Sequence, residues 1–279
     1  MKLSLPSPAK LNLFLHITGR RNDGYHDLQT LFQLLDYGDQ LEIKTNNTGK
    51  IELLGAKNSI CKRENLVILA AKAIQDYTAC SLGANISLNK CLPIGGGLGG
   101  GSSNAATTLL GLNAAWKLNL SNKELLSIGS KIGADVPVFV LGHTSWAEGI
   151  GEKLTIVERP SQWFLVLTTN IHVSTAEIFA HQGLTRNTHP IKIRAFDEKG
   201  WKNDCQPIVE SLYPEIKRAR QWLEKFSFAK LTGTGGCLFS SFSTEAEAQF
   251  VQKKIPVPWQ GFIAKGVNKS PILEILPPK

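Results

Sequence analysis

The sequence predicts an α+β fold divided between two domains. Its 279 residues exceed the roughly 150 residues of a domain of average size. Hydrophobic residues make up 42% and charged residues 19% of the chain, a balance that supports a buried core and argues against disorder. Strand and helix patterns are mixed along the chain, and the segment 158–161 (Glu-Arg-Pro-Ser) is typical of a linker. We therefore expect domains at residues 1–160 and 161–279.

Strand patterns begin the chain. Residues 10–17 alternate, so Lys10 and Asn12 share one face of a strand while aliphatic residues occupy the other. The tripeptide Asn22-Asp23-Gly24 is typical of a hairpin turn and predicts a second strand over residues 25–35. Shorter strands are expected over residues 40–44, 50–54 and 84–89.

Three helices are predicted in the first half. Residues 64–77 repeat apolar side chains at a period close to 3.6, which indicates an amphipathic helix. The composition of residues 104–118, rich in Ala and Leu, favours a second helix that starts once the preceding glycines end. A third should begin at Ser121, which has capping-box spacing to Glu124, and should end near Gly133.

The second half has a different order of elements. After short strands over residues 145–148 and 154–157, the patterns predict a strand, helices, two strands, a helix and a final strand. The first strand is expected over residues 163–168, and the helices near residue 175 and over residues 207–226. The two strands lie within residues 230–242, the next helix covers residues 244–254 and the final strand covers residues 261–267. This order is typical of a split βαβ sandwich.

The charge balance favours an anionic partner. Lys and Arg number 31 and Asp and Glu 23, which gives a formal net charge of +8. Basic residues are scattered, however, and the densest group, Lys217, Arg218 and Arg220, falls on a face of a helix that we expect to be exposed. No basic strip with interleaved aromatic residues is present. These basic residues are therefore interpreted as solvated surface, and neither nucleic acid nor a membrane is expected as a partner.

Cysteine usage indicates a reducing compartment. The five cysteines contain no Cys-x-x-Cys pair, so neither a disulfide framework nor a zinc ribbon is indicated. No apolar run approaches the roughly 20 residues of a membrane span. A cytoplasmic location is therefore expected.

A glycine tract is the strongest local signal. It has glycine at six of the seven positions from Gly95 to Gly101 and precedes a predicted helix. Such a segment is either a flexible linker or a loop whose amides cradle a phosphate at a helix N-terminus. We favour the phosphate loop and expect ATP contacts from Pro93, Ile94, Gly95, Gly96, Gly97, Leu98, Gly99, Gly100, Gly101, Ser102, Ser103 and Asn104.

The familiar nucleotide motifs do not fit this tract. Gly101 is followed by Ser102 and not by Lys-Ser or Lys-Thr, which excludes a Walker A loop. Gly95, Gly97 and Gly100 match the dinucleotide fingerprint, but the acidic residue nearest the required spacing, Glu124, lies in a helix cap. No zinc-protease or nucleophile-elbow pattern occurs. A dinucleotide oxidoreductase and an RNA-binding protein remain as alternative functions.

Three motifs in order resemble those of the GHMP kinase family, over essentially the whole chain. They are Pro8-Ala9-Lys10-Leu11-Asn12-Leu13, the glycine tract, and the segment 231–239 (Leu-Thr-Gly-Thr-Gly-Gly-Cys-Leu-Phe). Three glycines intervene between Leu98 and Ser102, and together with segments 24–30, 133–139 and 203–204 they resemble the diphosphocytidyl subfamily.

The resemblance implies a fold and a reaction. The N-terminal domain would be similar to ribosomal protein S5 domain 2 and the C-terminal domain to ferredoxin, with the active site in the cleft between them. The implied reaction is phosphorylation, by ATP with Mg²⁺, of the 2-hydroxyl of 4-diphosphocytidyl-2-C-methyl-D-erythritol, in the non-mevalonate route to isoprenoid precursors. The magnesium ligands and the oligomeric state are not indicated.

Two catalytic residues follow from the resemblance. Asp135 would be the general base and Lys10 its electrostatic partner, with Asn12 orienting the substrate. The local sequence alone also allows Asp135 to cap a helix or turn and Lys10 to be an ordinary surface lysine.

The remaining site residues would bind the cytosine. By resemblance, Tyr25 and Phe179 form walls around the ring, and His26 and Thr175 make further contacts. Tyr25 and His26 follow a turn and could instead only pack. In the third motif, Gly233, Gly235 and Gly236 would border the phosphates or simply form a tight turn between strands.

Overall fold

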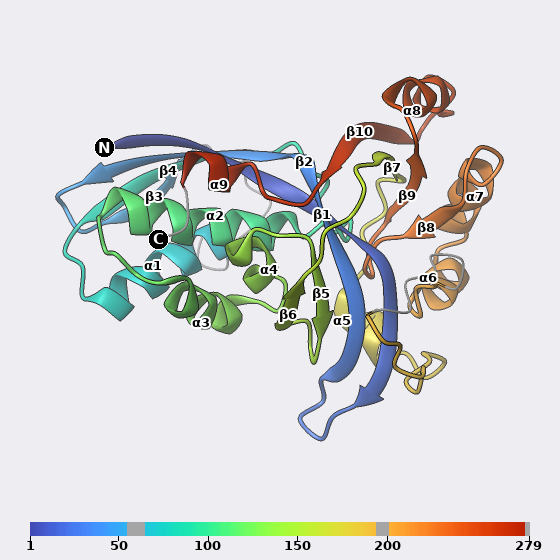
Figure 1. Ribbon diagram of the computed structural model, residues 1–279, viewed down its shortest axis with the longest axis horizontal. Helices are drawn as coiled ribbons and strands as arrows, with labels where there is room; N and C mark the ends of the chain where they lie inside the picture. Colours follow the sequence, from blue (N-terminus) through green and yellow to red (C-terminus); the bar gives the residue numbers. More distant parts are fainter. Residues whose placement is uncertain (55–64, 194–200, 277–279) are drawn as a thin grey trace.

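A computed structural model describes residues 1–54, 65–193 and 201–276 (Figure 1). It confirms the predicted mixture of helices and strands. The first half contains β1 (Lys2–Arg20), β2 (His26–Asn46), β3 (Ile51–Leu54), α1 (Leu66–Thr78), β4 (Gly83–Asn89), α2 (Gly100–Ala115), α3 (Asn122–Ile132), α4 (Val136–Leu141), β5 (Ser145–Glu148) and β6 (Lys153–Ile156). The second half contains β7 (Trp163–Thr168), α5 (Thr175–Ala180), α6 (Gln206–Leu212), α7 (Pro214–Leu223), β8 (Ala229–Leu231), β9 (Cys237–Phe242), α8 (Glu245–Gln252), β10 (Gln260–Val267) and α9 (Ile272–Ile275).

Strands β1 and β2 form a long antiparallel hairpin that runs through the molecule (Figure 1). The pairing slips between Pro8 and Lys10 and again between Asn12 and Leu15. Such irregularities re-aim side chains. They bracket Lys10 and Asn12, the two polar residues that the sequence places on one face.

Helices α1 to α4 cover the sheet formed by β1 to β6. Their apolar residues, such as Ile74, Leu109 and Val138, are fully buried in one cluster with side chains of β2 and β4. Leu273 of α9 lies in the same cluster although it comes from the end of the chain. The predicted boundary between residues 160 and 161 stays a prediction.

The second half has the expected split βαβ arrangement. Its strands lie side by side in the order β10-β7-β9-β8, which is the fourth, first, third and second along the chain, and all pair antiparallel. Leucines 165, 167 and 238 pack against helices α6, α7 and α8. The opposite face packs on the β1–β2 hairpin, where Phe14 and Phe164 share a cluster. Because β10 also pairs with β2, the two halves share a continuous sheet.

The predictions for the individual elements have mixed outcomes. Helix α3 is confirmed, with the Ser121 capping box present and Gly133 as its C-cap. The separate strands predicted over residues 25–35 and 40–44 are wrong, because pairing with β1 and β4 carries β2 through as one strand. The single helix predicted over residues 207–226 is wrong too: it is interrupted at Tyr213, ahead of Pro214, which removes a backbone donor and restricts the residue before it.

The first residues of helices α1 and α2 differ from the predicted ones. Helix α2 starts at Gly100, not at residue 104, so the last glycines of the tract form its first turn. Helix α1 starts at Leu66, with Asn65 as its N-cap. The predicted first residue of that helix, Glu64, and also Cys61 lie outside the described residues. Helices α4 and α9 are too short to produce a recognisable period, and neither was predicted.

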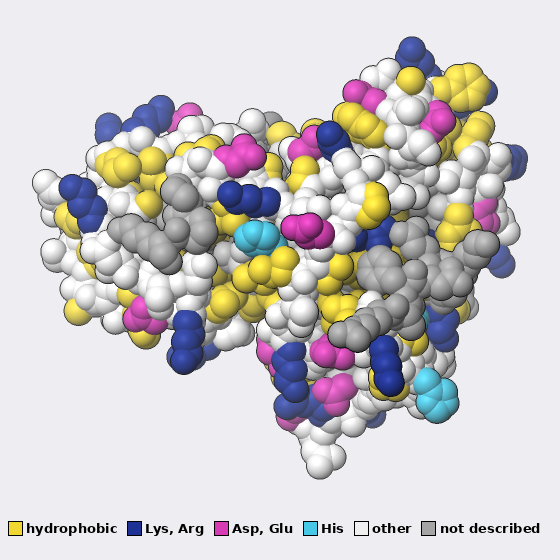
Figure 2. Space-filling model, in the orientation of Figure 1, with side chains coloured by type: hydrophobic (Ala, Val, Ile, Leu, Met, Phe, Trp, Pro, Cys, Tyr) yellow, Lys and Arg dark blue, Asp and Glu magenta, His cyan; other side chains and the backbone are white. Residues whose placement is uncertain are grey.

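Basic residues do not gather into one patch on the face shown in Figure 2, where Lys and Arg alternate with acidic and neutral side chains. Of the group on α7, Lys217 and Arg218 are exposed as predicted, whereas the Arg220 side chain is 17% exposed and pairs with Glu210 and Glu224. Within the described ranges, none of the helices has the length and hydrophobicity needed to cross a membrane.

Candidate active site

One pocket of about 760 Å³ collects most of the predicted site residues. Its lining comes from β1, the glycine tract, the α3–α4 junction, α5 and the β8–β9 turn. The predicted residues along its wall are Lys10, Asn12, Pro93 to Ser102, Asn104, Asp135, Thr175 and Phe179. Ser103 was also predicted to contact ATP, but it is fully buried and does not line the pocket.

The glycine tract needs its glycines because it packs against the β8–β9 turn. Gly97 has φ +79°, and a Cβ added there would lie 2.0 Å from the Thr232 carbonyl oxygen. The Gly95 and Gly96 carbonyls accept hydrogen bonds from the amides of Gly236 (3.3 Å) and Cys237 (3.2 Å). These contacts favour the fixed loop over the alternative of a flexible linker.

The carbonyls and amides of the tract differ in what they contact. Among the described residues, no acceptor receives a hydrogen bond from the amides of residues 97–102. The last three of these amides form the first turn of α2, whose N-cap is Gly99 with φ +70°. Free amides at a helix N-terminus carry partial positive charge and bind anions. The tract therefore has the features of a phosphate-binding loop.

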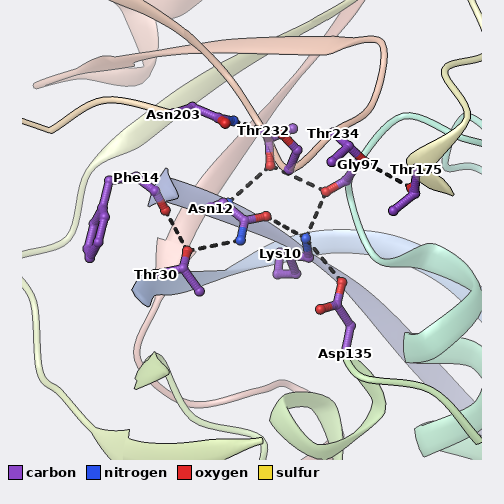
Figure 3. Close-up of polar contacts among 11 residues, drawn as sticks. Lys10, Asn12, Phe14, Thr30, Gly97, Asp135, Thr175, Asn203, Thr232 and Thr234 are labelled. Carbon is purple, nitrogen blue, oxygen red and sulfur yellow. Dashed lines mark hydrogen bonds and ion pairs between the residues drawn. The ribbon is translucent and has the colours of Figure 1, made fainter. Parts of the chain in front are cut away.

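Lys10 is buried at the centre of the site (Figure 3). Its ammonium Nζ contacts Asn12 Oδ1 at 2.6 Å, the Gly97 carbonyl oxygen at 2.9 Å and Asp135 Oδ2 at 3.3 Å. Three acceptors match the three donors of an ammonium group, which is how a buried charge is tolerated. Lys10 is thus not the surface lysine that the sequence alone allowed.

Asp135 stands at the junction of α3 and α4 and faces Lys10 (Figure 3). It occupies the N-cap position of α4, but its side chain makes no capping hydrogen bond, so the capping alternative is not supported. Its side chain is 35% exposed, whereas that of Lys10 is 3% exposed. Of the described residues that line the pocket, Asp135 is the one carboxylate.

Two threonines fix the orientation of Asn12. The backbone N–H of Asn12 donates to Thr232 Oγ1 at 3.0 Å, and its side-chain Nδ2 donates to Thr30 Oγ1 at 2.9 Å. Its Oδ1 is therefore left to accept from Lys10. No specific role was predicted for Thr30, which lies in segment 24–30, or for Thr232, which belongs to the third motif.

The third motif forms a tight turn between β8 and β9, and part of this turn also lines the pocket. Gly233, at φ +58°, lies in the turn and also lines the pocket. Gly235 packs so closely that a Cβ would lie 2.1 Å from the Gly97 amide nitrogen. Asn203 donates to the Gly233 carbonyl at 2.7 Å and to the Leu231 carbonyl at 2.9 Å, which fixes the turn from below.

The four residues expected at the cytosine are partly brought together. Phe179 and Thr175 line the pocket, and Thr175 Oγ1 hydrogen bonds Thr234 Oγ1 at 2.8 Å. The His26 ring lies beside Phe179, with 5.2 Å between ring centroids. Tyr25 is 60% exposed at the tip of the hairpin and does not line the pocket.

The imidazole of His26 is held in one tautomer. Arg186 Nε donates to His26 Nε2 at 3.0 Å, so the proton of the neutral ring is on Nδ1. Burial and the nearby charges of Arg186 and Arg20 lower the pKa of His26. The ring therefore stays neutral at pH 7.

A preformed metal centre is not found in the part of the chain that the structure describes, where no three His, Cys, Asp or Glu side chains converge. Asp135 alone could contribute a carboxylate oxygen. Mg²⁺ in nucleotide sites is commonly held by one or two carboxylates together with the phosphates and water. The residues present fit that mode of binding and do not fit an all-protein cage.

Comparison with known proteins identifies the family. The model of the GHMP kinases N terminal domain matches residues 65–143, and that of the GHMP kinases C terminal domain matches residues 185–259. A 4-diphosphocytidyl-2-C-methyl-D-erythritol kinase from Pseudomonas fluorescens is 53% identical over 96% of this chain and 95% of its own. The chain belongs to the GHMP kinase family. An enzyme of the same name from Marinobacter nauticus is 52% identical over 97% of this chain and 96% of its own.

Solved structures show the two-domain GHMP kinase fold. A crystal structure of 4-(cytidine 5'-diphospho)-2C-methyl-D-erythritol kinase matches with a TM-score of 0.84 and 28% identity, over 95% of this chain and all of the other. A mevalonate kinase matches with a TM-score of 0.70 at 17% identity, over 96% of this chain and all of the other, a likeness of fold alone. Membership in this kinase family favours neither alternative function, RNA binding or dinucleotide oxidation.

Proposed function

We propose that this GHMP kinase transfers a phosphoryl group from ATP to the 2-hydroxyl of 4-diphosphocytidyl-2-C-methyl-D-erythritol, a step of the non-mevalonate route to isoprenoid precursors. The observation that carries the reaction type is the contact of Lys10, Asp135 and the glycine tract around one pocket. The choice of substrate rests on the relatives about half identical over nearly the whole chain.

The glycine tract binds the phosphates of ATP in this proposal. The amides of residues 97–102 and the N-terminus of α2 supply donors and positive potential along one wall of the pocket. The Lys90 ammonium lines the same wall. Leu66 and Leu88 provide apolar surface in the pocket for the base of the nucleotide.

Asp135 acts as the general base. It takes the proton of the substrate hydroxyl while the oxygen forms a bond to the γ-phosphorus and the bond to the β-phosphate oxygen breaks, which releases ADP. Lys10 lies 3.3 Å from Asp135 Oδ2 and stabilises negative charge as the phosphoryl group moves. Asn12, oriented by Thr30 and Thr232, positions the acceptor.

The cytosine binds at the end of the pocket formed by Phe179. Stacking on the Phe179 ring, with His26 beside it, would orient the base, and Thr175 adds a polar contact. Tyr25 adjoins His26 in the chain and would close over the base from the hairpin tip when substrate binds. The partly exposed position of Tyr25 is compatible with such a closing contact.

Magnesium enters the proposal as a companion of ATP. When bound, it would neutralise phosphate charge, and Asp135 is the pocket carboxylate that could hold it through water or directly. A cytoplasmic location, the absence of nucleic-acid partners and the division at residue 160 also stay proposals.

One assay tests the substrate. ATP consumption is measured with 4-diphosphocytidyl-2-C-methyl-D-erythritol, mevalonate and homoserine under equal conditions. The proposal expects turnover with the diphosphocytidyl alcohol and only background with the other two. Equal turnover of mevalonate or homoserine would contradict the assigned substrate, and no turnover of any alcohol would contradict the kinase activity.

A further inference from the structure

We infer that Asp39 is a positioning residue that fixes both ends of the glycine tract for nucleotide binding. This rests on the proposed function, because it assigns the tract to the phosphates of ATP. Asp39 lies in β2, its side chain is fully buried, and it does not line the pocket. Any effect on catalysis must therefore pass through the residues that it contacts.

One carboxylate contacts the residues on both sides of the tract. Asp39 Oδ1 accepts hydrogen bonds from the amides of Cys91 at 2.8 Å and Leu92 at 2.9 Å, directly before the tract. Asp39 Oδ2 accepts from Asn104 Nδ2 at 2.9 Å, at the end of the tract in α2. The same Oδ2 forms an ion pair with Lys90 Nζ. The entry and the exit of the loop are thereby tied to a single side chain.

These contacts extend into β1. Asn104 Nδ2 also donates to Ser7 Oγ at 2.8 Å, and Ser7 Oγ donates to Ser103 Oγ at 2.9 Å. The first turn of α2 is thus held against both long strands. Because Lys10 is three residues beyond Ser7 in β1, this network also fixes the tract relative to the catalytic lysine.

The Lys90 ammonium connects the network to the pocket. Its Nζ lies 3.2 Å from the position of a Cβ added to Gly100, so it stands beside the first turn of α2. Without Asp39, the Lys90 ammonium would lose its ion pair and keep the longer hydrogen bond to Asn104 Oδ1 at 3.4 Å. With it, a positive charge is held close to the amides that would contact the phosphates.

The physical benefit is preorganisation. A segment with six glycines loses much conformational entropy when it is ordered, and a ligand that must order it binds more weakly. Anchoring both ends within the folded protein removes part of that cost before the nucleotide arrives. A buried carboxylate is costly unless it is fully paired, and four donors converge on Asp39.

The substitution Asp39→Asn separates positioning from folding. The amide keeps an oxygen for Cys91 and Leu92 but places an NH₂ group against two donors, Lys90 and Asn104. We expect at least about tenfold weaker binding of a nonhydrolysable ATP analogue, measured by calorimetry, and a similar rise in the KM for ATP. The KM for the alcohol should change by less than about twofold.

The matched control is Asp204→Asn. Asp204 is also a buried carboxylate paired with a lysine, and it accepts from the Ile17 amide and Thr188 Oγ1, away from the tract. A comparable loss of thermal stability is expected, with unchanged affinity for the ATP analogue. Equal nucleotide affinity in the two variants would overturn the inference.

A milder variant keeps the inference testable if Asp39→Asn fails to fold. Ser7→Ala removes only the hydroxyl that orients Asn104, and we expect about threefold weaker binding of the analogue with the fold retained. Unchanged binding in Ser7→Ala would count against the network. If the unaltered protein does not bind the analogue, it is the proposed function that fails.

Discussion

Lys10 and Asp135 differ in burial, and the difference suits the roles proposed for them. The Lys10 ammonium has three protein acceptors and 3% exposure of its side chain, so its position is fixed. Asp135 keeps 35% exposure and faces the pocket, so one oxygen remains available to a hydroxyl. A general base must be within hydrogen-bond reach of the proton that it removes. The fixed cation and the accessible carboxylate meet that requirement.

Asp135→Asn should abolish most of the turnover while the fold remains. The amide keeps the shape but cannot accept a proton, which predicts about 10²–10⁴-fold lower kcat. The variant should still fold, because the side chain is partly exposed, caps no helix and keeps an oxygen that can accept from Lys10, but loss of the charge opposite buried Lys10 should lower the melting temperature. Steady-state kinetics and a melting curve check both statements, and near-normal turnover would remove Asp135 from the mechanism.

Tyr25→Ala tests whether the exposed ring joins the substrate. Aromatic stacking on a base contributes about 1–3 kcal/mol, so the KM for the cytidylated alcohol should rise about 5–150-fold. An analogue of the substrate that lacks cytosine should show no change. Phe179→Ala, on the opposite side of the proposed base, is the matched variant and should show the same selectivity. Equal losses for both alcohols would rule out a role in reading the base.

His16 should make the protein sensitive to acid. Its ring is buried beside Phe14, and among the described residues neither ring nitrogen has a hydrogen-bond partner. Burial lowers the pKa of His16, an effect that Asp204 opposes and Lys202 reinforces. The unfolded chain therefore binds this proton more readily, so stability falls as pH drops below the ordinary value of 6.5.

The variant His16→Leu should reduce that pH dependence. One proton contributes at most about 1.4 kcal/mol per pH unit to the free energy of unfolding. Urea unfolding at about pH 7.5 and about pH 5.5 measures the slope. Some slope should persist because the pKa of His26 is lowered as well. His189→Leu, which removes an exposed imidazole, is the control, and a slope unchanged by His16→Leu would contradict the assignment.

The glycine tract is where element structure depends on single residues. Gly97→Ala combines a strained positive φ of +79° with a Cβ 2.0 Å from the Thr232 oxygen. Gly49→Ala has a similar φ of +72° but meets its nearest atom at 3.2 Å. Gly49→Ala is therefore the control, and its positive φ alone should lower the free energy of unfolding by about 1–2 kcal/mol. Gly97→Ala should lower the free energy of unfolding by more than this and should also abolish ATP binding. Melting curves and calorimetry measure the two effects.

Helices and strands could be predicted where their signals are local. The ends of α3 follow from the Ser121 box and Gly133, which lie within the helix itself. The continuity of β2 could not be predicted, because it depends on pairing with β1, β4 and β10, all distant or later in the chain. The start of α2 at Gly100 was missed for a similar reason, since glycine propensity is overridden by packing against Leu92 and Leu66.

At the scale of the whole molecule, the site assembles from segments far apart in the sequence. Lys10 meets Gly97 and Asp135, and Asn12 meets Thr232, a separation of 220 residues. Hydrogen bonds from Gly236 and Cys237 to the tract join the two halves at the pocket. The reactive geometry is therefore a property of the assembled fold and not of either half.

This assembly also explains which site residues the sequence could indicate. Lys10, Asn12, Asp135 and the tract lie within contiguous motifs, and the structure brings them together. Asp39 belongs to no motif, and segment 24–30 gave no specific role to Thr30; both contact partners distant in the sequence, which only the structure shows. Burial of polar groups, not sequence pattern, is the signal that identifies such residues.

The most direct test of the account is a crystal structure with a nonhydrolysable ATP analogue and the diphosphocytidyl alcohol both bound. The account predicts the triphosphate against the amides of residues 97–102. It also predicts the acceptor hydroxyl within about 3 Å of the Asp135 carboxylate, beside Lys10. A triphosphate bound away from the glycine tract, or a hydroxyl out of reach of Asp135, would contradict it.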